Sequence, residues 1–104
     1  MEDNVVPFRV PLKADDAVEI IRNAAQDTGN LLGWSEHVWP QMVARGIMNR
    51  QVLTVIEEGE LKGEPTWSPE HEDWVCLLSK FVSGRLVTVV VGVDGNVVTI
   101  VTAY

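Results

Sequence analysis

The sequence predicts a small α+β protein in which about three helices precede, and pack on, a four-stranded and mainly antiparallel sheet. Two observations predict this class. Apolar residues first recur at helical spacing, and from Leu61 onward they form β-branched runs separated by short turns that contain glycine. The length of 104 residues fits one domain, 1–104, with an extended arm over 1–13, a helical part over 15–58 and a sheet over 61–104.

Composition and charge limit the classes of function. No apolar run reaches the roughly 18 residues that a membrane helix needs, and the acidic start at Met1–Asn4 lacks the layout of a secretion signal. The single cysteine, Cys76, excludes an intrachain disulfide and suits a reducing cytoplasm. A net charge of −7 repels nucleic acid, so we expect no DNA binding, and any RNA contact must rest on a small local group of cations.

Two helices are predicted before Gly46. Asp16 is a good helix cap, and the apolar stripe that follows it predicts a helix as far as about Gln26. Ser35 is a second good cap, and the helix after it should end at Gly46. Pro40 falls inside this second helix, so either the helix kinks there or it starts late with Pro40 as its first residue. We favour the kink.

A third helix and four strands are predicted after Gly46. Asn49 should cap a helix over 50–58. The first strand should lie at an edge of the sheet, because Pro65 cannot donate to a neighbouring strand. The predicted strands cover 61–67, 74–82, 85–93 and 97–104.

The strand pairing predicts which side chains share a face of the sheet. Two-residue turns at 83–84 and 94–95 would give one face a long apolar floor with polar side chains gathered at one end. These polar residues are Lys80, Arg85, Thr102 and Tyr104. Such a face could be a pocket with an anion-binding end, or it could simply hold the solvated ends of strands. A single bulge would exchange the faces beyond it, and the sequence leaves open which face the helices cover.

The candidate acid–base and metal residues are few. His37 suits general acid or base catalysis at neutral pH, although a lone histidine on a helix is more often structural. His71 lies in an acidic, polar segment and is expected in a solvated loop. A metal site of His71, Asp73 and Cys76 matches no standard ligand spacing, so we expect no metal and no cofactor.

Several short motifs resemble a known family when they are taken together. They are Ser35-x-His37, Met42-x-x-Arg45-Gly46-Ile47, Val52, Gly59 and the closing segment Val97–Tyr104. Their order and spacing resemble the bacterial family named domain of unknown function 4258. That family is similar in architecture to the barnase, RelE and colicin type of microbial ribonuclease. The resemblance implies metal-independent cleavage of single-stranded RNA by a toxin-type endoribonuclease, with RNA as substrate and an antitoxin-like protein as partner.

The resemblance also implies roles for particular residues. His37 would be the base or the acid, Arg45 and Arg85 would bind phosphate, and Tyr104 would donate a proton or stack on a base. Lys80 and Thr102 would contact the substrate. Gln41 stands where members of the family often have arginine.

Two classes of function therefore remain open. The first is a RelE-like ribonuclease, active or degenerate. The second is a non-catalytic interaction module that forms a homodimer, or binds another protein, through an apolar face of its sheet.

Overall fold

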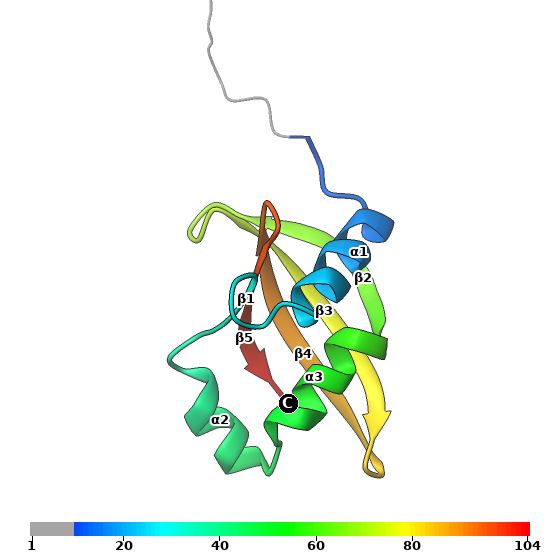
Figure 1. The fold of residues 1–104 in the computed structure, drawn as a ribbon, viewed down its shortest axis with the longest axis vertical. Coiled ribbons are helices and arrows are strands. Elements are labelled where there is room, and N and C mark those ends of the chain that lie inside the picture. Colours follow the sequence, from blue (N-terminus) through cyan, green and yellow to red (C-terminus); the bar gives the residue numbers. More distant parts are fainter. Residues whose placement is uncertain (1–9) are drawn as a thin grey trace, which may run out of the picture.

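The computed structural model describes residues 10–104, which form three helices and five strands (Figure 1). The helices are α1 (Ala14–Ala25), α2 (Val38–Arg45) and α3 (Asn49–Glu58). The strands are β1 (Leu32–Trp34), β2 (Glu60–Ser68), β3 (Asp73–Val82), β4 (Arg85–Asp94) and β5 (Val97–Ala103). The α+β class is confirmed, and each predicted helix and strand has a counterpart whose ends differ by a few residues.

The sheet is mixed and has one strand more than predicted. Its strands lie in the order β1-β5-β4-β3-β2, and β1 runs parallel to β5 while every other neighbouring pair is antiparallel. The prediction of four strands was wrong because β1, within the predicted helical part, is only three residues long. So short a strand shows no alternation of its own, and its partner is far away in the sequence.

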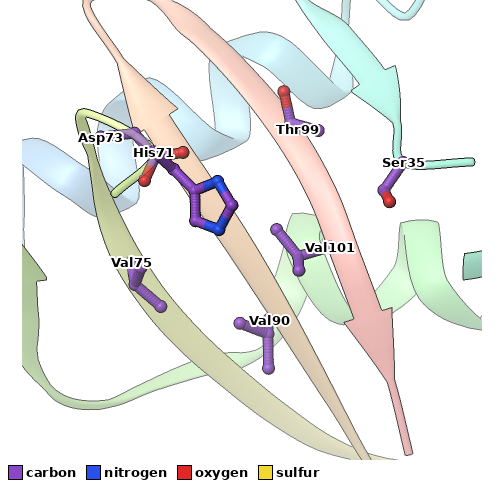
Figure 2. Close-up of a pocket in the computed structure, with 7 residues that line it drawn as sticks. All are labelled: Ser35, His71, Asp73, Val75, Val90, Thr99 and Val101. Atoms are coloured by element: carbon purple, nitrogen blue, oxygen red, sulfur yellow. The ribbon is translucent and has the colours of Figure 1, made fainter. Parts of the chain in front are cut away.

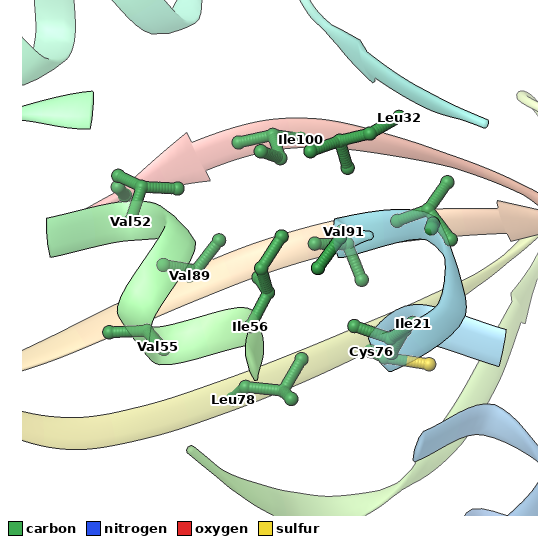
Figure 3. Packing of buried hydrophobic residues seen from close by; sticks show 14 of the residues in the cluster. Ile21, Leu32, Val52, Val55, Ile56, Cys76, Leu78, Val89, Val91 and Ile100 are labelled. Atoms are coloured by element: carbon green, nitrogen blue, oxygen red, sulfur yellow. The ribbon is translucent and has the colours of Figure 1, made fainter. Parts of the chain in front are cut away.

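Helices α1 and α3 cover one face of the sheet, which we call the closed face (Figure 3). Side chains from both helices and from the strands meet there in one apolar core. Ile21 of α1, Ile56 of α3 and Leu78 of β3 have no solvent exposure. The opposite face, which we call the open face, is covered by none of the helices between residues 10 and 104 (Figure 1).

Helix α2 starts later than the favoured prediction. Its first residue is Val38, and Ser35 forms the preceding turn instead of the cap, since Ser35 O accepts the Val38 N–H at 3.1 Å. Pro40 is therefore the third helical residue, where a missing N–H costs nothing because the first turn has no intrahelical acceptor. Pro40 thus removes no intrahelical hydrogen bond, and the reason for predicting a kink is absent. Gly46 ends the helix, as predicted, in the left-handed conformation with φ 66°.

The edge position of β2 is confirmed. It pairs only with β3, and its register shifts between Lys62 and Thr66, around Pro65. The turn at 83–84 is confirmed, because Val82 pairs with Arg85. The next turn lies one residue later than predicted.

A bulge in β5 decides which residues reach the open face. Val91 pairs with Ile100, whereas Val90 pairs with Thr102, so Val101 is an extra residue in β5. Side chains after the bulge exchange faces. Thr102 and Tyr104 therefore lie on the open face, and the prediction that they share a face with the apolar floor was wrong.

Two further expectations concern the start of the chain and the membrane. Most of the predicted extended arm, 1–9, lies outside the described residues, and 10–13 form neither helix nor strand. Among the helices of residues 10–104, none has the length and apolar character needed to cross a membrane.

Candidate functional site

Two adjoining pockets lie on the open face. The first, which we call the Asp73 pocket, has a volume of about 340 Å³ (Figure 2). Its lining residues are Ser35, His71, Asp73, Val75, Val90, Thr99 and Val101. The second, which we call the Arg45 pocket, has a volume of about 600 Å³. Its lining residues are Ser35, His37, Gln41, Arg45, His71, Val101, Thr102 and Tyr104. The shared residues Ser35, His71 and Val101 join the two pockets into one cleft.

Arg45 is fixed at the end of α2, beside the edge of β5. Its Nη1 donates hydrogen bonds to the carbonyl oxygen of Ala103 at 2.7 Å and to Thr102 Oγ1 at 3.3 Å. Thr102 Oγ1 in turn donates to Gln41 Oε1. Strand β1 pairs with β5 only as far as Ile100, so this part of the edge is left for α2. The same contacts that dock α2 also orient the guanidinium at the rim of the pocket.

The two histidines of the chain come from different turns and line the same pocket. His37 follows β1, and its backbone N–H donates to Ser35 Oγ at 3.2 Å. His71 lies between β2 and β3, and its backbone N–H donates to Ser68 Oγ at 3.3 Å. Each imidazole has a neighbouring carboxylate: Nε2 of His37 lies 3.7 Å from Glu36, and Nε2 of His71 lies 3.4 Å from Glu70. Both rings are exposed to solvent and free to meet a ligand in the cleft.

Tyr104 lines the Arg45 pocket and directly follows β5. Its backbone exchanges two hydrogen bonds with Thr88, at 2.8 and 2.7 Å, which extend the β4–β5 pairing past the bulge. Its ring is half exposed on the open face. A phenol held there can donate a hydrogen bond into the pocket.

Lys80 and Arg85 lie on the other face. Nζ of Lys80 is 3.7 Å from the carboxylate of Glu58 in α3. The guanidinium of Arg85 lies next to the Gly46 turn, and neither side chain lines the cleft. The expected group of Lys80, Arg85, Thr102 and Tyr104 is thus divided, because the Val101 bulge turns the last two away. The structure brings together His37, Arg45, Thr102 and Tyr104.

Asp73 is the unusual acid of the cleft. Its carboxylate lies over Gly92 of β4, and no donor within residues 10–104 reaches its buried Oδ1. Burial raises the pKa of Asp73, nearby His71 lowers it and Asp94 raises it, and the net direction is upward. A carboxylate with an unsatisfied oxygen at a pocket wall is poised to accept a hydrogen bond from a ligand.

The hypothetical metal site of His71, Asp73 and Cys76 is contradicted by the geometry. Cys76 lies on the closed face, whereas Asp73 and His71 lie at the open face. Burial, and secondarily Asp73, raises the pKa of the Cys76 thiol to about 11, so it is a poor ligand and nucleophile. In the part of the chain that the structure describes, no three His, Cys, Asp or Glu residues are grouped to hold a metal ion.

The sequence predicts His71 in a solvated loop and offers Asp73 only as a ligand in the metal site of His71, Asp73 and Cys76. The available signal for Asp73 was Gly92, which interrupts the run of valines in β4. A glycine inside a strand often marks a close approach by another group. No comparable signal points to His71, because its position depends on how the turn between β2 and β3 folds over the sheet.

The cleft contains groups that can transfer protons and one group that can bind an anion. Two imidazoles, a phenol and a carboxyl group can exchange protons with a bound molecule. Arg45 is the cation of the cleft and can bind one phosphate or carboxylate group. The nearby carboxylates of Glu36 and Glu70 oppose nonspecific binding of polyanions.

Comparisons with known proteins identify a family for this chain. Neither the search of curated proteins nor the search of solved structures gave a match. Residues 34–104 match the family described as Domain of unknown function (DUF4258). The matched segment begins in β1 and includes every residue that lines the two pockets. Since it spans more than half of the sequence, the chain belongs to the family Domain of unknown function (DUF4258).

Proposed function

We propose that this protein is a metal-independent endoribonuclease that cleaves single-stranded RNA in the cleft of the open face. The observation that supports it is the gathering of His37, Arg45, Thr102 and Tyr104 around the Arg45 pocket. These residues come from the start of α2, the end of α2 and the end of β5. RNA cleavage needs these kinds of groups at one phosphate: a base, an acid and a cation.

The proposed reaction uses the 2′-hydroxyl of the substrate as nucleophile. One imidazole removes the proton of the 2′-hydroxyl while O2′ forms a bond to phosphorus. The bond from phosphorus to O5′ breaks, and an acid donates a proton to O5′. The products are a 2′,3′-cyclic phosphate and a free 5′-hydroxyl. His37, in the Arg45 pocket, is the proposed base, and Tyr104, in the same pocket, is the proposed acid.

Arg45 is the proposed ligand of the phosphate. Its guanidinium already donates to Thr102 and Ala103, so its orientation is set before substrate binds. A preorganised cation stabilises the negative charge that develops on the phosphate in the transition state. Gln41, hydrogen-bonded to Thr102, lies where a second cation would complete the site. Substitution of Gln41 by arginine is therefore expected to raise the rate.

The test is cleavage of a single-stranded RNA in EDTA by the purified protein. The wild type should generate 2′,3′-cyclic phosphate ends, and His37→Ala should lower the rate by about 10²–10⁴-fold, the usual contribution of an acid or base. Arg45→Ala should lower it as well. Arg85→Ala is the matched control, because that arginine lies on the closed side and should leave the rate unchanged. Absence of cleavage by the wild type at high protein concentration would contradict the proposal.

A second candidate function is supported by the apolar character of the open face. Several large apolar side chains there are solvent-exposed, and such a surface commonly marks an interface. They are Phe81, Leu86, Val97, Val101 and Tyr104. A second copy of this chain, or an antitoxin-like protein, would cover them and block the cleft. Light scattering tests the homodimer: a monomer at high concentration contradicts it, and a dimer that Phe81→Ser dissociates supports it.

A further inference from the structure

The Asp73 pocket contains a hydrogen-bond acceptor that the protein leaves unused. Oδ1 of Asp73 is buried and has no donor within residues 10–104. Buried polar atoms in folded proteins nearly always have a partner, so an unpaired carboxylate oxygen beside a pocket needs an explanation. Rotation about the Cβ–Cγ bond of aspartate is soft, and it can turn either oxygen towards the pocket.

The position of the Asp73 carboxylate depends on a glycine in the neighbouring strand. Gly92 lies within β4 between valines, and a Cβ atom at this position would overlap the carboxylate of Asp73. Glycine inside a strand lowers stability relative to alanine, by an amount that a packed side chain would recover. The strand thus keeps a less stable residue at the one point where Asp73 approaches it.

The other walls of the pocket suit a flat ring. Val75, Val90 and Val101 form an apolar floor, and the imidazole of His71 projects over the same floor (Figure 2). The hydroxyl groups of Ser35 and Thr99 lie at the opposite side from Asp73 (Figure 2). The volume of about 340 Å³ falls in the range of small-molecule sites, about 300–1,000 Å³.

The neighbouring pocket indicates what kind of ring this is. The Asp73 pocket opens into the Arg45 pocket through their shared residues Ser35, His71 and Val101. A nucleotide whose phosphate binds Arg45 would therefore place its base towards Asp73. Unpaired RNA bases are recognised by stacking on rings such as histidine and by hydrogen bonds to their edges.

We propose that the Asp73 pocket binds one RNA base next to the cleaved phosphate and selects a base with an exocyclic amino group. This inference rests on the proposed function. Adenine, cytosine and guanine each offer an amino N–H to the carboxylate. Uracil offers only a ring N–H between two carbonyl oxygens, which the carboxylate repels. The pocket therefore rejects uracil, and the amide of asparagine at position 73 removes the discrimination.

The test is calorimetric titration of the full chain with the four nucleoside 3′-monophosphates. The wild type should bind the adenosine, cytidine and guanosine nucleotides about tenfold or more tightly than the uridine nucleotide, as expected for a hydrogen bond to a charged group. Asp73→Asn should bring the four affinities together. Asp94→Asn is the matched control, because it removes a nearby negative charge without touching the pocket, and it should keep the preference. Gly92→Ala, which displaces the carboxylate without removing its charge, should lose it.

The titrations and the RNA cleavage assay together distinguish the base pocket from the proposed ribonuclease. Equal affinities in the wild type, or a preference that survives Asp73→Asn, would overturn the base pocket. No detectable binding of any of the four nucleotides would overturn it as well. If RNA is cleaved but Asp73 does not affect base preference, the ribonuclease stands without this pocket. If the preference depends on Asp73 but RNA is not cleaved, the pocket stands and the ribonuclease fails.

Discussion

The two faces of the sheet differ in composition and in how completely their groups are satisfied. The closed face carries side chains such as Leu78, Val89 and Ile100, none of which has solvent exposure. The open face carries exposed apolar side chains, both histidines and the unpaired oxygen of Asp73. Binding sites commonly tolerate such unfavourable features, while packing elsewhere supplies the stability. The comparison indicates that the closed face holds the fold together, whereas the open face carries the groups that stay available to a ligand.

The largest expected difference between the faces is in the free energy of unfolding. Ile56→Ala opens a cavity between α3 and the sheet and should lower that free energy by about 2–5 kcal/mol. Phe81→Ala, at a side chain that is 73% exposed on the open face, should change it by about 0.5 kcal/mol or less. Urea denaturation measures both. Similar losses for the two variants would contradict the division between the faces.

An intermediate effect on the free energy of unfolding is expected for Gly92, which lies in β4 directly beneath the carboxylate of Asp73. Gly92→Ala places a Cβ against the carboxylate of Asp73 and should destabilise the protein by about 1–3 kcal/mol. In an Asp73→Ala background the same change should be neutral, or stabilising by up to about 1 kcal/mol, because alanine suits a strand better than glycine does. A double-mutant cycle by urea denaturation measures this coupling. Additive effects of the two substitutions would show that the carboxylate of Asp73 does not lie against Gly92.

The smallest expected effect is the pH dependence that Asp73 gives to stability. Because burial raises the pKa of Asp73 above its ordinary value of 3.8, the folded state binds this proton more tightly than the unfolded state does. The resulting stabilisation is present below pH 3.8 and is lost as the pH rises through the folded-state pKa. Asp73→Asn should therefore lose less stability than the wild type over this range. His71 and Asp94 are the titratable groups that act on Asp73, and both stay unchanged in this variant.

Thermal melting from about pH 3 to pH 7 measures this difference. Glu64→Gln, the same kind of neutralisation on the exposed edge strand, serves as control and should follow the wild type. A parallel pH profile for wild type and Asp73→Asn would show that Asp73 ionises as freely when folded as when unfolded.

Most of the fold was predictable because its signals are local. Pro65 indicated an edge strand, Gly46 a helix end, and Ser83 with Gly84 a tight turn, and the structure has each of them. Strand β1 was missed because its parallel pairing with β5 leaves no short-range pattern. The alternative, a helix that starts late with Pro40 as its first residue, comes nearer to the structure, in which Pro40 is the third helical residue, whereas the cap preference of Ser35 favours an earlier start.

The candidate site was predictable only in part, because it depends on which face of the sheet each strand side chain occupies. The motif around Ser35–Ile47 indicates His37 and Arg45, and they line one pocket with Thr102 and Tyr104. Strict alternation along ideal strands predicts that Lys80 and Arg85 share a face with Thr102 and Tyr104. The extra residue Val101 in β5 interrupts this alternation, so the side chains after it lie on the opposite face. No residue type requires a bulge there, so the face that Thr102 occupies follows only from the pairing of whole strands.

The parallel pairing of β1 with β5 also sets the order in which the fold can be completed. Leu32 lies beside Val98, so 66 residues separate the two partners (98 − 32). During synthesis, β1 and α2 emerge from the ribosome well before the strand on which both must dock. Contacts of such long sequence separation form slowly. The contacts of α2 with β5, and with them the Arg45 pocket, can therefore form only after β5 has been made, and a ligand of this cleft can bind only after that point.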